Sequence, residues 1–322
     1  MKHRNNIIDV MKGLAILCVM IGHTYWCPRW LYIFIFSFHI PLFFIISGYF
    51  AKTREELAMS RGGYIRKSIK QLLIPYAVVA CVACLYTSIQ AYFYKDASIV
   101  THTMAKYMFA WDTTWEGSVF DKWDGPTWFL LSLFWARLFF FGLLSKTGKW
   151  FIPLCVALSV TMILLHPYVP TPFGIGRGIQ ALMFMAIGFA YQRYKIPTWV
   201  KIIAVACWPI SMLFGNIDMY GYQYNFLSVD IFGACGASLV VYYVSKGLTK
   251  TFVSPFFTWC GRNSLVILCA HSIEMNMTLI HFATKLLPFK MPMMLFFGMK
   301  HGFTLLGAWG YGAVRQKLTA KI

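Results

Sequence analysis

Long apolar segments alternate with short polar ones along nearly the whole chain. A helix that crosses a bilayer needs about 20 mostly apolar residues. Ten segments approach this pattern: 7–26, 31–51, 72–94, 126–145, 151–166, 177–192, 200–215, 226–245, 263–282 and 292–313. They lack the strict alternation of apolar and polar residues that marks a membrane β-barrel. Because a helix satisfies its own backbone hydrogen bonds in lipid, the pattern predicts an all-α integral membrane protein with about ten transmembrane helices.

Composition supports a membrane location. Hydrophobic residues make up 59% of the 322 residues and charged residues 12%, whereas soluble domains are about 45–50% apolar and about 25% charged. This excess argues against a soluble enzyme of the same length. A net charge of +18 would by itself be compatible with nucleic-acid binding. Here the cations lie between apolar segments, so we expect contacts with anionic lipids and phosphorylated ligands, and no nucleic acid.

The cations also predict an orientation. With ten spans, both termini lie on the same side. The segments on that side hold 19 Lys and Arg residues and those on the opposite side hold 6. Because cytoplasmic loops carry the excess of Lys and Arg, we expect both termini in the cytoplasm. No cleavable signal peptide is evident, and residues 1–322 are expected to form a single multi-pass domain in the cell (inner or plasma) membrane.

The first two segments carry histidines within apolar surroundings. Lys12 and His23 are eleven residues apart, which on a helix is about 16 Å and almost three turns, so both face nearly the same way. In the second segment His39 is followed by Pro41, which interrupts helical hydrogen bonding and frees carbonyls that could line a cavity. Each histidine is either a functional group or a hydrogen-bonded packing residue, since ionisable groups in lipid are costly.

Polar residues recur in three later segments. Arg66 and Lys70 precede Leu72-Leu73-Ile74-Pro75-Tyr76 and could clamp phosphates or act only as topological signals. His271 and Glu274 share a helical face and could form a proton relay or a polar lock. A metal site there would need further ligands, and nine cysteines lying mostly in apolar runs give no zinc pattern, so no metal is predicted.

The longest outer segment, 95–125, combines carboxylates with tryptophans. It holds Asp96, Asp112, Glu116, Asp121 and Asp124, together with Trp111, Trp115 and Trp123. Aromatic faces and carboxylates suit a sugar ring. The alternative is a solvated loop with an interfacial aromatic belt.

Five short motifs, in order, resemble those of the membrane acyltransferase-3 family. They are Lys12-x10-His23; the stretch Phe38–Tyr49, which is similar to the fucose-4-O-acetylase-like branch; the basic run into Leu72-Leu73-Ile74-Pro75-Tyr76; Gly125-Pro126-Thr127-Trp128-Phe129-Leu130; and Gly261-Arg262-Asn263-Ser264-Leu265 with His271. Together they extend from Asp9 to His271. About ten core spans is also what the family implies.

The resemblance implies transfer of an acyl group, most often acetyl from acetyl-CoA, to a hydroxyl of a carbohydrate or lipid-linked glycan. It implies acyl-CoA as co-substrate and no tightly bound cofactor. The chemistry needs a base, donors for the thioester oxyanion and cations for phosphates. The candidate catalytic residues are His23, His39, His271 and Glu274. Candidates for donor binding are Lys12, Arg66, Lys70 and Arg262, and candidates for acceptor or oxyanion contacts are Trp128, Asn263 and Ser264.

Several alternatives remain open on sequence alone. The acyl group could be succinyl, and transfer could be direct or pass through an acyl-enzyme, with direct transfer preferred because no nucleophile motif is visible. A multi-span transporter or a lipid or glycan flippase is the rival class. It would explain the charges of Arg137, Asp230, Lys300 and His301 within apolar segments.

Overall fold

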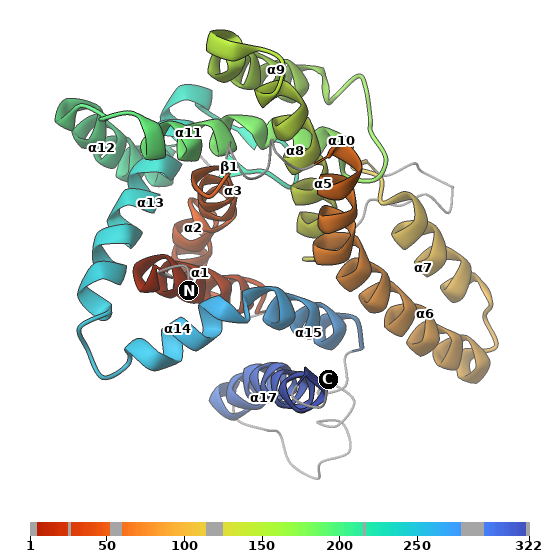
Figure 1. The fold of residues 1–322 in the computed structure, drawn as a ribbon. Helices are drawn as coiled ribbons and strands as arrows, with labels where there is room; N and C mark the ends of the chain where they lie inside the picture. Colours follow the sequence, from red (N-terminus) through yellow and green to blue (C-terminus); the bar gives the residue numbers. More distant parts are fainter. Residues whose placement is uncertain are drawn as a thin grey trace.

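The computed structural model describes residues 5–24, 27–51, 60–113, 125–214, 217–277 and 293–319 (Figure 1). Nearly all regular structure in these ranges is helical. The two strands described are β1 (Ile217–Asp218) and β2 (Gln223–Tyr224), an antiparallel hairpin in which Ile217 pairs with Tyr224. The predicted all-α class is therefore confirmed for the described part of the chain.

Most helices coincide with predicted segments, but those at Arg61–Ser68, Ser98–Phe109 and Ser254–Arg262 lie in stretches predicted to connect spans. In the N-terminal half they are α1 (Asn6–Gly22), α2 (Arg29–Phe36), α3 (His39–Tyr49), α5 (Arg61–Ser68), a π-helical turn (Ile69–Leu73), α6 (Ile74–Tyr94), α7 (Ser98–Phe109) and α8 (Trp128–Leu144). In the C-terminal half they are a 3-10 turn (Gly148–Trp150), α9 (Phe151–Leu165), α10 (Ile175–Gln180), α11 (Leu182–Arg193), α12 (Thr198–Phe214), α13 (Leu227–Leu248), α14 (Ser254–Arg262), α15 (Ser264–Met277) and α17 (Met293–Thr319).

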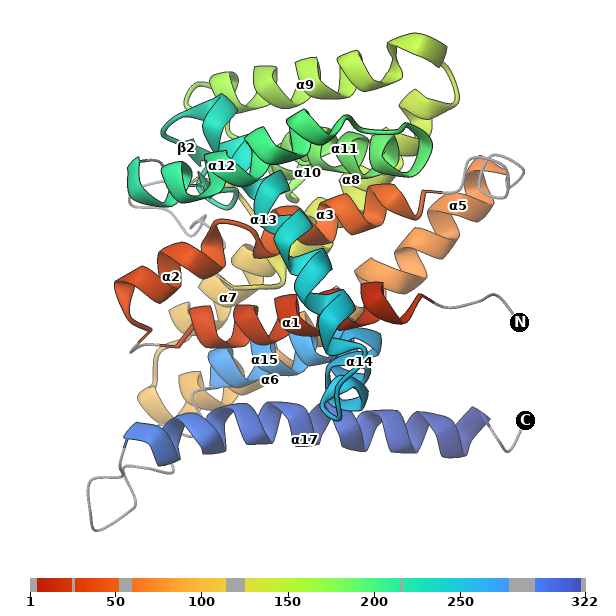
Figure 2. The same ribbon diagram turned by 90° about the vertical axis from the view of Figure 1, so that its left-hand side faces the viewer.

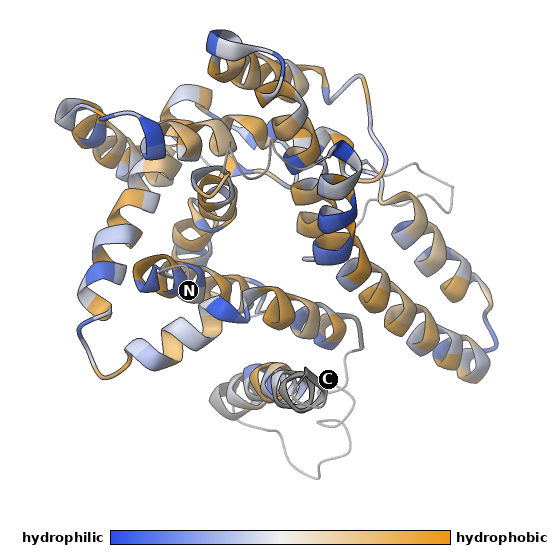
Figure 3. Cartoon of the chain, viewed as in Figure 1, coloured by the Kyte–Doolittle hydropathy of each residue, from blue (hydrophilic) through white to orange (hydrophobic). Residues whose placement is uncertain are grey.

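The outer surface of the helices is strongly apolar. Large side chains such as Leu85, Phe93 and Leu213 are more than two-thirds exposed, and apolar colouring extends over the outer helices (Figure 3). Among the described residues, four helical stretches are long and apolar enough to cross a membrane: Arg29–Tyr49, Arg61–Tyr94, Gly148–Leu165 and Leu227–Leu248. Exposed apolar surface of this extent suits lipid. The count of ten crossings and the cytoplasmic side of the termini remain predictions.

Small residues bring helices into close contact. A Cβ atom at Gly48 of α3 would collide with the backbone of Met185 in α11, and one at Gly188 would collide with the backbone of Ile45. A Cβ atom at Gly261 of α14 would likewise collide with the backbone of Asp9 in α1. Close backbone approach through small residues is typical of membrane helices, which lack a hydrophobic drive to associate. Gly48 and Gly261 of the recognised motifs therefore have a packing role.

The second predicted segment is broken, as expected, but not at Pro41. α2 ends at Phe36 and α3 begins at His39, so the interruption falls on Ser37 and Phe38. Pro41 is the third residue of α3, where its missing N–H would lack an intrahelical partner in any case. The break places His39 at the start of a new helix.

The helices around the centre lie nearly side by side. α15 contacts both α1 and α17, and the axes of the three helices are roughly aligned, with α17 antiparallel to α1 (Figure 2). The N-terminal end of α1 and the C-terminal end of α17 lie at the same end of the bundle, together with α5 (Figure 2). The β1–β2 hairpin lies toward the opposite end. A residue's position along α1 or α15 thus indicates its depth between these two ends.

Candidate functional site

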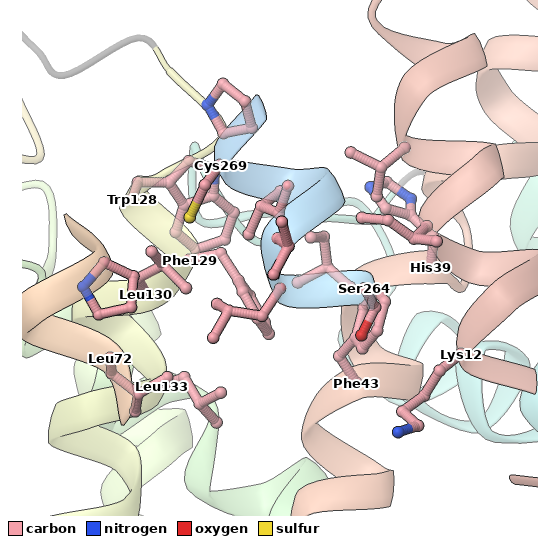
Figure 4. Close-up of a pocket in the computed structure, with 18 of the residues that line it drawn as sticks. Lys12, His39, Phe43, Leu72, Trp128, Phe129, Leu130, Leu133, Ser264 and Cys269 are labelled. Carbon is pink, nitrogen blue, oxygen red and sulfur yellow. The ribbon is translucent and has the colours of Figure 1, made fainter. Parts of the chain in front are cut away.

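A cavity of about 1590 Å³ is enclosed mainly by α1, α3, α6, α8, α15 and α17. A pocket for one drug-sized ligand is about 300–1,000 Å³, so this cavity has room for two substrates together. Its lining is mostly apolar. Lys12 and His39 lie on one side and Trp128 and Leu133 on the other, with Ser264 of α15 between them (Figure 4).

His23 lines this cavity at the C-terminal end of α1. Its Nδ1 lies 2.8 Å from the carbonyl oxygen of Val19. A carbonyl can only accept a hydrogen bond, so Nδ1 carries the hydrogen in the neutral ring and Nε2 keeps a lone pair. Lys12 also lines the cavity, as their shared helical face predicts. Neutral His23 can therefore accept a proton at Nε2.

His39 has the same local arrangement but is fully enclosed. Its Nδ1 donates to the carbonyl of Ile35 at 2.8 Å, and the same carbonyl accepts from the backbone N–H of Phe38 at 3.3 Å. The side chain is 1% exposed, and its Nε2 is buried without a hydrogen-bond partner. The ring of Phe36 packs against both histidines, with its centroid 5.7 Å from that of His23 and 4.7 Å from that of His39. Both predicted bases thus reach the same cavity.

His271 and Glu274 lie close together on α15, as their spacing indicates. His271 Nδ1 is 3.7 Å from Glu274 Oε2. The His271 ring packs edge-on against His23 at 5.8 Å between centroids. Glu274 also pairs with Lys300 of α17 at 3.7 Å, and His301 Nε2 lies 3.1 Å from the hydroxyl of Thr24. The polar side chains of α15 and α17 therefore meet beside His23.

Lys300 and His301 were not among the residues predicted for the site. Their sequence signal is their charge within an apolar segment, which marks a functional candidate by default. Sequence alone could not show that α17 packs on α15.

The four predicted donor-binding cations separate into two pairs. Lys12 and Lys70 line the cavity, whereas Arg66 is exposed and is not among the described lining residues. Arg262 instead donates from Nε to Asp9 at 3.2 Å, and Asp9 also pairs with Lys12 at 3.2 Å. Asp9 thus ties α14 to α1. The structure brings Lys12 and Lys70 to the cavity and leaves Arg66 and Arg262 outside its described lining.

The predicted acceptor and oxyanion residues also separate. Trp128 and Ser264 line the cavity. The side-chain amide of Asn263 donates to the carbonyl of Trp259 at 2.9 Å, at the junction between α14 and α15. Its side-chain nitrogen is therefore used to cap a helix, and Asn263 is not among the described lining residues.

The β1–β2 hairpin contributes a part of the lining that the sequence did not reveal. Asp218 and Tyr220 line the cavity near Trp128, and the Trp128 and Tyr220 rings are 5.7 Å apart. The buried Arg177 supports both rings, with its guanidinium carbon 4.5 Å from the Tyr220 centroid and 5.6 Å from that of Trp128. The sequence signal for this part of the site is the run Asp218-Met219-Tyr220-Gly221-Tyr222, which combines a carboxylate with two aromatic residues in a short loop.

The predicted aromatic and acidic outer loop is only partly described. Glu116, Asp121, Asp124, Trp115 and Trp123 lie outside the described residues. Asp112 is buried and accepts hydrogen bonds from Thr171 N and Oγ1, each at 2.7 Å, and from the Tyr222 hydroxyl at 3.0 Å. Burial beside this carboxylate raises the pKa of the Tyr222 phenol, which remains a donor. Asp112 therefore joins three loops.

No group of three or more His, Cys, Asp or Glu residues in the described ranges is arranged to hold a metal ion. A family model described as an acyltransferase domain matches residues 5–312 of the chain. No curated protein and no solved structure matches it.

Proposed function

Because this chain belongs to the acyltransferase-3 family and is thus a membrane acyltransferase, we propose that it transfers acetyl from acetyl-CoA to a carbohydrate hydroxyl, as in the fucose-4-O-acetylase-like branch. One observation carries the proposal. His23, with its Nε2 available, faces a cavity that has cations near one end and aromatic rings with a carboxylate near the other. Donor and acceptor can then meet at the histidine from opposite ends.

The donor enters at the end that holds Lys12 and Lys70. Cations suit the phosphates of acetyl-CoA, because hydrogen bonds between charged groups are about twice as strong as neutral ones. In the predicted orientation this end faces the cytoplasm, where acetyl-CoA is made. The protein would then act in the cell membrane.

The acceptor sugar binds at the opposite end, against Trp128 and Tyr220, with Asp218 accepting hydrogen bonds from its hydroxyls. Two aromatic rings and a carboxylate converge there. Flat apolar faces pack on a sugar ring, and a carboxylate accepts from its O–H groups. An exported or lipid-linked glycan would reach this end from outside the cell.

His23 acts as the general base. Its Nε2 takes the proton of the acceptor hydroxyl while the hydroxyl oxygen forms a bond to the acetyl carbonyl carbon. The carbon–sulfur bond then breaks, and the thiolate of CoA takes the proton back from the imidazolium. Ser264 lines the cavity seven residues before His271 on α15, which is about 10 Å along the helix axis, so we assign it no contact with the oxyanion at His23. Room for both substrates supports direct transfer without an acyl-enzyme.

His271 and Glu274 support the charged form of His23. Glu274 Oε2 lies 3.7 Å from His271 Nδ1, and the His271 ring packs edge-on against His23. A carboxylate in this position offsets the positive charge that develops on the base.

Mass spectrometry of the host's glycans tests the proposal. Glycans from cells that have the chain are expected to carry one additional alkali-labile acetyl ester on a sugar, and glycans from cells that lack it are expected to be unmodified. An added succinyl group would instead identify a succinyl donor in place of acetyl-CoA. Identical glycan masses in both strains would contradict transfer to a carbohydrate.

A further inference from the structure

Arg137 of α8 lines the same cavity but has no part in the mechanism above. Its Nη1 donates to the amide oxygen of Gln71 at 2.9 Å. Among the described residues no carboxylate pairs with it. An arginine has five N–H donors and keeps its charge at any physiological pH, so most of its binding capacity is available to a ligand.

Tyr64 of α5 holds the same guanidinium from a second direction. The Arg137 guanidinium carbon is 6.0 Å from the Tyr64 ring centroid. The Tyr64 ring is buried and stacks on Phe141 at 4.2 Å with an angle of 12° between the planes. The Tyr64 hydroxyl also donates to the backbone carbonyl of Arg137 at 3.4 Å. These contacts restrict the arginine before any ligand binds, which lowers the entropy cost of binding.

The π-helical turn Ile69–Leu73 explains how Gln71 reaches Arg137 while Lys70 also faces the cavity. Consecutive residues of an α-helix point about 100° apart, yet Lys70, Gln71 and Leu72 all line the cavity. Single π-helical turns inside helices are frequent at functional sites. The turn thus lets Lys70, the chain neighbour of Gln71, line the same cavity as the arginine.

The charges of the cavity lining are separated. Its described cations are Lys12, Lys70 and Arg137, and its described carboxylates are Asp218 and Glu274. Lys12 already forms an ion pair with Asp9, and Glu274 forms one with Lys300. Lys70 and Arg137 are therefore the lining cations for which no carboxylate partner is found among the described residues. Such a pair attracts a phosphate ester.

We propose that Arg137, held by Gln71 and Tyr64 and assisted by Lys70, binds the phosphates of the acyl donor and selects CoA over donors that lack them. This role rests on the proposed use of acetyl-CoA. A phosphate ester could also come from a lipid headgroup, and the two sources are separable by experiment.

Titration of the purified full-length chain in nanodiscs tests the assignment. CoA and pantetheine, which lacks the nucleotide and its phosphates, are the probes, and wild type is compared with Arg137→Gln. Arg137→Gln is expected to weaken CoA binding about tenfold to a hundredfold and to leave pantetheine binding unchanged. Lys146→Gln, which removes an exposed cation just beyond α8, is the matched control and is expected to bind CoA like wild type.

Four results would overturn the assignment. Equal CoA affinity in wild type and Arg137→Gln would remove Arg137 from the donor site and leave the proposed function intact. Equal losses for CoA and pantetheine would mean that Arg137 only supports the fold. Equal CoA affinity combined with weaker retention of anionic phospholipid by Arg137→Gln than by wild type would assign the arginine to a lipid headgroup. If wild type binds no CoA, the proposed donor itself is wrong.

Discussion

Single hydrogen bonds decide what the two cavity histidines can do. In both rings Nδ1 donates to a carbonyl four residues earlier, that of Val19 for His23 and of Ile35 for His39. Each ring is thereby fixed in one tautomer with a basic Nε2. The difference between them lies in their neighbours. Both rings pack against Phe36, but His23 also adjoins His271, whose Nδ1 is 3.7 Å from Glu274. This difference favours His23 as the base.

Glu274→Gln tests whether the carboxylate supports the charged base. The substitution keeps the size of the side chain and removes its charge, so we expect turnover to fall about tenfold, or about 1.4 kcal/mol of transition-state stabilisation. Initial rates of acetyl transfer at saturating acetyl-CoA measure this effect. Glu274→Asp, which keeps the charge, should recover part of the lost turnover. Asp96→Asn, which removes an exposed carboxylate, is the control and should turn over like wild type. Full activity in Glu274→Gln would exclude the role.

At the scale of helices, the sequence predicted which segments are helical better than it predicted which residues meet. Helical periodicity correctly places Lys12 near the same cavity as His23, and His271 near Glu274, because the two residues of each pair belong to the same helix. The contact of Arg137 with Gln71 joins residues 66 positions apart, and no local pattern encodes it. The contact of Asn263 is local, since its amide donates to the carbonyl of Trp259 four residues earlier, at the end of α14.

Helix packing through glycine gives a prediction for the α3–α11 pair. Gly48→Ala places a methyl group against the backbone of Met185, which cannot move as a flexible side chain can. Overpacking of this kind costs about 1–3 kcal/mol, so we expect a lower thermal midpoint of the detergent-solubilised protein. Gly142→Ala of α8, where nothing lies within 4 Å of the new methyl group, is the matched control and should not be less stable. Equal midpoints for the two variants would contradict the packing role.

For the whole molecule, charge separation along the cavity links topology to mechanism. The lining cations lie toward one end and Asp218 toward the other, and the predicted orientation places the cationic end in the cytoplasm. The charges that favoured a transporter have local explanations. Asp230 accepts from Ser211 and from the backbone of Phe226, which ties α12 to α13. Lys300 and His301 join the polar group beside His23.

Cysteine labelling in intact cells tests this orientation. With the nine native cysteines replaced, a cysteine at Ala97 should react with a membrane-impermeant maleimide, because the segment after α6 is predicted to face outward. A cysteine at Gly62 should react only after the cells are permeabilised. Both positions are exposed in the structure, so access to the probe is not limited by packing. The reverse pattern would place the donor end outside the cell and contradict the assignment of the two substrates.

The most direct test of the account is transfer of radiolabelled acetyl from acetyl-CoA by membranes that contain His23→Gln. Glutamine keeps hydrogen-bonding capacity but cannot act as a base near neutral pH, and a general base contributes about 10²–10⁴-fold. We therefore expect label in the carbohydrate fraction to accumulate at least about a hundredfold more slowly, with a thermal midpoint close to that of wild type. If His23→Gln keeps most of the activity while His39→Gln loses it, the base is His39, and the central claim for His23 is wrong.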